Sequence, residues 1–229
     1  MSGIDALNQA IVRCRKCPRL VRWREEVARQ PPPRYQGQKY WARPLPGFGD
    51  PRARLLIVGL APAAHGGNRT GRIFTGDRSG DWLYETLYRF GFSNQPSSTH
   101  PGDGLLLKDC YITAAVRCAP PDNKPTIEEF ERCRPYLLQE LKLLKHIRLI
   151  IALGTIAFDS FLRVYQENGG KLPKPRPPFS HGGVARLDNG LTLLASYHPS
   201  QQNTFTGKLT REMFRSVFEN AKKLLGESM

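Results

Sequence analysis

Four of the five cysteines fall into two pairs whose thiols could hold a metal centre. Two residues separate Cys14 from Cys17, and fourteen separate Cys118 from Cys133. An odd number of cysteines in a chain expected to be cytoplasmic disfavours a disulfide framework. Four thiolates bind both zinc and iron–sulfur clusters, and the spacing alone fits either. Cys110 lies within an apolar run and is expected to be buried and inert.

Two further residues with catalytic potential stand in glycine- and proline-rich segments. His198 follows an apolar run directly, where its ring could place a donor against developing negative charge. Asp77 lies in a glycine-rich segment and could hold a water molecule. Each has a structural alternative. A histidine can simply pack or cap, and an acid is favourable at a helix N-terminus, which is expected just after Asp77.

The elements that position these residues alternate between short apolar runs and amphipathic helices. Runs typical of strands buried on both faces occupy residues 55–58, 110–116, 148–153 and 191–196. Helical patterns occupy residues 3–29 (interrupted near 14–18), 79–89, 126–146, 155–165 and 208–225. Pro135 is expected to kink or divide the longest of them. The alternation predicts an α/β fold with a central, mostly parallel four-stranded sheet covered on both faces.

Parallel sheets bind ligands at the carboxyl ends of their strands. The segments that leave those ends are 59–78, 117–124 and 197–206, and we expect the chemistry there. Residues 168–183 are rich in glycine, proline and cations and are predicted to form a long loop.

The charge balance indicates a polyanionic partner. The chain has 229 residues, with 34 Lys and Arg against 20 Asp and Glu, a formal net charge of +14. An excess of this size costs self-repulsion, and nucleic acid is the leading explanation. No apolar stretch approaches the roughly 18 residues of a membrane span. We therefore expect a cytoplasmic, nucleic-acid-binding protein.

Four motifs occur in a fixed order along the chain. They are the Cys14/Cys17 pair, Gly59-Leu60-Ala61-Pro62-Ala63 with the glycine-rich segment 71–80, Val116-Arg117-Cys118-Ala119-Pro120 through Pro125 with Cys133, and Tyr197-His198-Pro199-Ser200. The ordered set, over about residues 10–220, resembles the iron–sulfur-containing uracil-DNA glycosylases. Leu60, Ala63 and Ala114 replace polar or glycine residues typical of family 4, and these departures match family 5.

The resemblance implies a fold, a cofactor and an activity. It implies one domain over residues 1–229 with a three-layer α/β/α sandwich. It also implies a structural 4Fe–4S cluster on Cys14, Cys17, Cys118 and Cys133 that ties in the N-terminal segment. The implied enzyme is a monomer that hydrolyses the N-glycosidic bond of uracil, and of other deaminated bases, in double-stranded DNA. It would leave an abasic site and so start base excision repair. No catalytic lysine motif points to an additional lyase step.

Such an enzyme must extrude the target nucleotide and polarise its base. On the family pattern, His198 would donate to the departing base, and Asp77 would hold the attacking water. Phe74 would stack on the base, although a phenylalanine here could also be an ordinary residue of the hydrophobic core. Asn123 would pair with the base edge, although its surroundings are also ordinary turn composition. The first motif would line the pocket with the backbone of Gly59, Ala61 and Ala63.

Contact with the DNA duplex is expected from the loop after His198. Phe205 is the only large apolar residue there and could wedge between base steps. Its alternative role is to cap the last helix. Flanking contacts are expected from Ser200, Asn203, Lys208 and Arg211, with further phosphate contacts from Arg69 and residues 171–176.

Two rival functions use the same residues. The first is a non-enzymatic, zinc-bound module that binds nucleic acid, which colour distinguishes because iron–sulfur proteins are brown. The second is a nucleotide-binding enzyme that uses the glycine-rich turn after the first strand. Pro62 and the absence of a Walker lysine argue against it.

Overall fold

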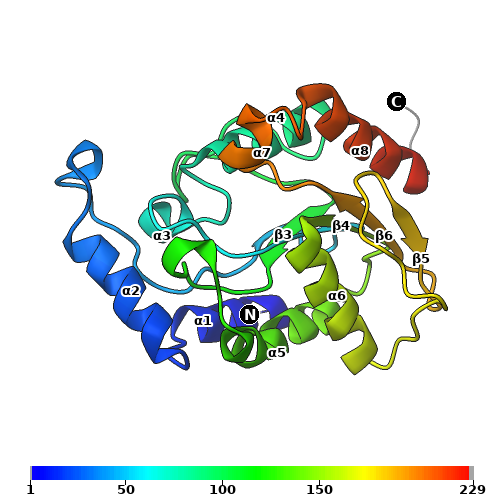
Figure 1. The fold of residues 1–229 in the computed structure, drawn as a ribbon, viewed down its shortest axis with the longest axis horizontal. Coiled ribbons are helices and arrows are strands. Elements are labelled where there is room, and N and C mark those ends of the chain that lie inside the picture. Colours follow the sequence, from blue (N-terminus) through cyan, green and yellow to red (C-terminus); the bar gives the residue numbers. More distant parts are fainter. Residues whose placement is uncertain (1, 227–229) are drawn as a thin grey trace.

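A twisted six-stranded sheet forms the centre of the computed structural model, which describes residues 2–226 (Figure 1). The strand order is β1-β3-β2-β4-β6-β5. The four inner strands are mutually parallel, and each edge strand pairs antiparallel with its neighbour. The strands are β1 (Phe48–Gly49), β2 (Leu55–Gly59), β3 (Cys110–Ala114), β4 (Leu149–Leu153), β5 (Val184–Arg186) and β6 (Thr192–Ser196).

The four apolar runs are the four parallel strands, which confirms that part of the prediction. The predicted strand number of four is wrong, because the sheet also contains β1 and β5. Both edge strands are very short, and Val184 in β5 is 45% exposed. A short, half-solvated edge strand lacks the continuous apolar run that marks a strand buried on both faces.

Helices cover both faces of the sheet, as the three-layer prediction requires (Figure 1). One face packs against α4 and α8 through side chains such as Leu83 and Phe214. The other packs against α1, α5 and α6 through Ile11, Leu137 and Phe161. The helices are α1 (Gly3–Val12), α2 (Pro18–Arg29), α3 (Gly67–Thr70), α4 (Arg78–Arg89), α5 (Ile127–Leu143), α6 (Thr155–Glu167), α7 (Gln201–Phe205) and α8 (Arg211–Leu224), with single 3-10 turns at Pro33–Tyr35 and Pro121–Asn123.

The start of α5 follows directly from its sequence. The side chain of Thr126 accepts from the backbone of Glu129, and the Glu129 side chain accepts from the backbone of Thr126, which forms a capping box. Pro135 lies inside α5 without dividing it, because the helix runs from Ile127 to Leu143. Of the two outcomes predicted for Pro135, division of the helix is therefore wrong, and a kink stays a prediction.

The loops at the carboxyl ends of the parallel strands gather at one edge of the sheet. They lead to α3 after β2, to the 3-10 turn at Pro121–Asn123 after β3, to α6 after β4 and to α7 after β6. Residues 201–205 form the short helix α7 where a loop was expected. Within residues 2–226, none of the helices combines the length and apolar character needed to cross a membrane.

Candidate active site and cysteine cluster

Four cysteines from three parts of the chain line one small cavity. Cys14 lies in the turn between α1 and α2, Cys17 caps the N-terminus of α2, Cys118 follows β3 and Cys133 lies in α5. Cys110 is fully buried in β3 and does not line the cavity. Across residues 2–226, no three His, Cys, Asp or Glu side chains are grouped as ligands of a single metal ion.

A buried arginine points at this cavity. Arg24 of α2 is 2% exposed, and its Nη1 donates to the Sγ of Cys118 at 2.9 Å. Its Nη2 donates to the carbonyl of Cys14 at 3.4 Å, while its Nε has no partner. Within the described chain Arg24 forms no ion pair with a carboxylate. A buried cation needs negative charge nearby, and the cysteine sulfurs are the atoms placed to supply it as thiolates.

A second buried arginine connects the cysteines to the sheet. The backbone N–H of Arg117 donates to the Sγ of Cys133 at 3.3 Å. Its guanidinium forms a fully buried ion pair with Glu140, which also accepts from the hydroxyl of Thr113 in β3 at 2.6 Å. The position of Cys133 on α5 is therefore fixed relative to the central strands.

His198 stands at the end of β6, where the sequence predicted it. Its carbonyl accepts from Nδ2 of Asn203 at 2.8 Å, which fixes the turn into α7. A Cβ added to Gly154 would lie 3.4 Å from the Cβ of His198, so the end of β4 is close by. Burial lowers the pKa of His198 to about 4. The imidazole is therefore neutral near pH 7, with one nitrogen able to donate.

Phe74 lies beside His198 in a strained backbone conformation. The centroids of the two rings are 6.0 Å apart and their planes are tilted by 30°. Phe74 adopts a φ of +52°, which is rare for a bulky residue and is typical of functional sites. Its ring lies over Gly59, where an added Cβ would approach to 2.7 Å. Gly59 is thus required for close packing at the floor of the site.

Asp77 caps α4, which is the structural role considered from the sequence. Its Oδ1 accepts from the backbone N–H of Gly80 at 3.0 Å. Its Oδ2 points at Gly66, where an added Cβ would come within 2.2 Å. Burial raises the pKa of Asp77, partly opposed by the hydrogen bond from Gly80. One carboxylate oxygen is therefore used by the helix, and the other faces the loop after β2.

The loop after β2 connects the two sites. Ala61 is partly exposed and also packs against the buried cysteines. The carbonyl of Ala63 accepts from the backbone of Gly66 and Asn68, both at 3.2 Å. The sequence assigned no role to His65. Its Nδ1 atom lies 2.9 Å from the hydroxyl oxygen of Tyr40.

The segment after His198 presents an exposed aromatic ring. Ser200 caps α7 by accepting from the backbone of Asn203 at 3.3 Å. Phe205 is 67% exposed, and its ring lies 4.3 Å from the guanidinium of Arg78 at the start of α4. The last helix is capped by the hydroxyl of Thr210 instead. The alternative in which Phe205 caps that helix is therefore wrong.

The predicted DNA-contacting cations differ in the contacts that they already make within the protein. Lys208 lies with its Nζ 5.0 Å from the centre of the Tyr197 ring. Arg211 is already paired with Glu85. Arg69 donates to the carbonyls of His65 and Gly76 and to Gln38, so its charge holds the loops together.

Asn123 is exposed, with a φ of +56° in the 3-10 turn after β3. Its predicted contact with a base stays a prediction.

Sequence reasoning missed Arg24 and Arg78. Arg24 is 94 residues from its partner Cys118, so only the fold brings them together. Its one sequence signal is its place seven residues after Cys17, on the same face of α2. Arg78 directly follows Asp77, but its contact with Phe205 depends on α7, a helix that the sequence did not predict.

Comparison with known proteins agrees with this arrangement. The profile described as the Uracil DNA glycosylase superfamily matches residues 46–222. A type-5 uracil-DNA glycosylase of Mycobacterium bovis is 54% identical over 225 residues, which cover 98% of this chain and 82% of the relative. Another, of Thermus thermophilus, is 53% identical over 222 residues, which cover 97% and 98%. A type-4 uracil-DNA glycosylase of Pyrobaculum aerophilum is 31% identical over 198 residues, which cover 86% and 83%. The chain therefore belongs to the uracil-DNA glycosylase superfamily and, within it, to the type-5 group.

Proposed function

We propose that this protein is a cytoplasmic, monomeric and monofunctional DNA glycosylase that removes uracil and other deaminated bases from double-stranded DNA. It hydrolyses the N-glycosidic bond and leaves an abasic site, the first step of base excision repair. The observation that carries the proposal is the pairing of a neutral His198 with Phe74 at the carboxyl ends of the parallel strands. The names of the relatives and the net charge of +14 support the same substrate.

The residues of the site divide the reaction between them. The flipped base would stack on Phe74, and His198 would donate to its oxygen as negative charge develops on the departing base. The sugar, which gains cationic character, would then capture a water molecule held by Asp77. Asn123 would pair with the base edge, and the backbone of Gly59, Ala61 and Ala63 would bound the pocket. Leu60 and Ala63 offer no polar side-chain groups that would select one base, which fits a broad range of substrates.

We also propose that Cys14, Cys17, Cys118 and Cys133 hold a structural 4Fe–4S cluster. All four line one cavity, and the buried Arg24 beside them lacks a carboxylate partner. When bound, the cluster would supply a cross-link and the thiolate charge that Arg24 requires. The chain's own residues carry the reaction, because His198, Phe74 and Asp77 do not line the cysteine cavity.

Cleavage of short duplexes that each carry one uracil, hypoxanthine or xanthine tests the proposed function directly. We expect excision of uracil and of at least one deaminated purine, each leaving an alkali-labile abasic site. Strand breaks that form without alkali would show a lyase step and contradict monofunctional action. A protein that binds these duplexes but leaves every base in place would be a nucleic-acid-binding module and not an enzyme.

Asp77→Asn separates the two roles of Asp77. Asparagine is as good an N-cap as aspartate, so the variant should keep the melting temperature of the wild type. It removes the negative charge that would hold and activate water, and we expect single-turnover excision to slow by at most about 10²-fold. The loss should be smaller than that for His198→Ala, because a sugar cation captures water readily once formed. A wild-type rate would leave Asp77 with its helix-capping role alone.

Phe205→Ala tests the predicted contact with the duplex. The ring is 67% exposed and contributes little to the core, so the melting temperature should change by no more than a degree or two. If Phe205 wedges into the duplex, affinity for lesion-containing DNA should fall by about tenfold or more, since aromatic stacking on a base is worth about 1–3 kcal/mol. Tyr88→Ala is the matched control, because Tyr88 is 51% exposed on α4. A stability loss with unchanged DNA affinity would contradict this role for Phe205.

A further inference from the structure

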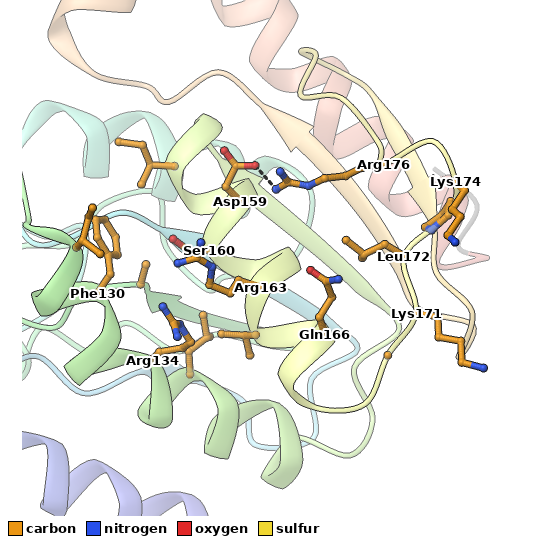
Figure 2. Close-up of a pocket in the computed structure, with 17 residues that line it drawn as sticks. Phe130, Arg134, Asp159, Ser160, Arg163, Gln166, Lys171, Leu172, Lys174 and Arg176 are labelled. Carbon is orange, nitrogen blue, oxygen red and sulfur yellow. Dashed lines mark hydrogen bonds and ion pairs between the residues drawn. The ribbon is translucent and has the colours of Figure 1, made fainter.

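A groove of about 960 Å³ lies between α5 and α6, away from the residues of the proposed reaction. Figure 2 shows Phe130 and Arg134 on one wall and Asp159, Arg163 and Gln166 on the other. Residues 170–174 and Arg176, from the loop after α6, close the remaining side. His198, Phe74, Asp77 and the four cysteines do not line this α5–α6 groove.

The lining of the α5–α6 groove is strongly cationic. Asp159 is its only acidic side chain, and it is paired with Arg176 across the groove (Figure 2). Arg163 and Lys174 are exposed, and neither forms an ion pair within residues 2–226. The cations that line the groove are Arg134, Arg163, Lys171, Lys174 and Arg176, and Arg134 is paired with Glu167, which stands outside the lining. Arg163 and Lys174 therefore give the groove positive charge that no ion pair of the described residues neutralises.

The α5–α6 groove also has an apolar floor and apolar ends. Leu137 and Val164 form part of the floor and are buried. Ile127 and Ile156 also line the groove, yet they are 73% and 49% exposed. Each stands in the first turn of its helix, where polar residues are usual. Exposed aliphatic side chains next to a cationic rim are the surface composition that an amphipathic ligand would cover.

We propose that the α5–α6 groove binds an acidic peptide segment of a partner protein that carries bulky apolar side chains. Its carboxylates would meet Arg163 and Lys174, and its apolar side chains would cover Ile127 and Ile156. An amphipathic segment laid between two helices is a common mode of peptide recognition. This site is separate from the proposed reaction.

The alternative occupant is duplex DNA, because the sequence predicts phosphate contacts from residues 171–176. A duplex would satisfy the cations with phosphates but would leave Ile127 and Ile156 against its polar backbone. A single strand would also need aromatic rings for its bases to stack on, and Phe130, the only aromatic side chain that lines the groove, is half-buried. The exposed side chains between the cations are aliphatic, so a peptide with apolar side chains fits the groove better.

Fluorescence anisotropy with a labelled peptide of alternating Asp and Leu that ends in Phe tests the proposal. We expect saturable binding that weakens as salt is added. Arg163→Glu and Ile156→Asp should each weaken it by about tenfold, through lost charge attraction and lost apolar contact respectively. Both positions are exposed, and an aspartate in the first turn of α6 is favourable, so both variants should fold. Lys108→Glu, at an exposed lysine outside the groove, should bind as the wild type does.

Three further results would overturn the proposal. The peptide could fail to bind saturably, or Lys108→Glu could weaken it as much as Arg163→Glu does. Arg163→Glu could also lower affinity for duplex DNA and leave the peptide unaffected, which would make the groove a nucleic-acid surface. Excision of uracil by Arg163→Glu should equal that of the wild type, because Arg163 touches none of the residues of the proposed reaction.

Discussion

His198→Ala is expected to slow single-turnover excision of uracil by about 10²–10³-fold, the usual worth of one preorganised donor in a shielded site. Breaking the glycosidic bond leaves negative charge on the base, and His198 is the side chain placed beside Phe74 to meet it. The variant should still bind duplex DNA that carries an abasic site, because the ring is not part of the predicted DNA-contacting surface. The measurement is the excision rate under saturating enzyme.

Because the pKa of His198 is lowered, the pH dependence of the excision rate also tests its role. Since burial lowers the pKa of His198 to about 4 from 6.5, the wild-type rate should show no step near pH 6.5 that depends on His198. Between about pH 6.5 and 4, His198 binds a proton in the unfolded chain but not in the folded one. The free energy of unfolding therefore falls progressively as the pH is lowered through this range. His146→Ala, at an exposed histidine before β4, is the control. A wild-type rate for His198→Ala would remove His198 from the chemistry.

The parts of the fold that the sequence predicted correctly are those marked by an unbroken apolar run or by a hydrogen-bonding pattern between near neighbours in the chain. The run Leu55–Val58 is apolar at every position, as a strand buried on both faces must be, and β2 follows it. Thr126 and Glu129 mark the start of α5 by a hydrogen-bonding pattern that needs no tertiary contact. His198 could be placed at the rim because it directly follows such a run.

The missing parts depend on contacts that are distant in the sequence. β1 consists of two residues that join the sheet only because β3 offers them a free edge. The strained φ of Phe74 is set by packing on Gly59 and by neighbours of its loop, such as Tyr84, whose hydroxyl donates to the carbonyl of Ile73 at 2.8 Å. The pKa of His198 depends on burial, which a sequence pattern does not measure.

Cys118→Ala is expected to bleach the purified protein and to lower its free energy of unfolding by about 3–5 kcal/mol, the cost of stripping a buried charge of its partner. The charge is that of Arg24, whose Nη1 donates to the Sγ of Cys118. Loss of the proposed cluster would also release the turn between α1 and α2 from α5, since Cys14 and Cys133 line the same cavity. Visible absorption, iron content and thermal unfolding report the three effects.

Cys110→Ala is the matched control, because Cys110 is also buried but lies within β3 and outside the cavity. It should keep the colour and the iron and lose only about 1 kcal/mol through the small cavity that it leaves. Bleaching by Cys110→Ala without bleaching by Cys14→Ala would contradict the ligand assignment. A colourless wild-type protein that contains zinc would contradict the iron–sulfur cluster but not the ligands. Arg24 needs thiolate charge beside it with either metal, so the stability loss in Cys118→Ala would remain.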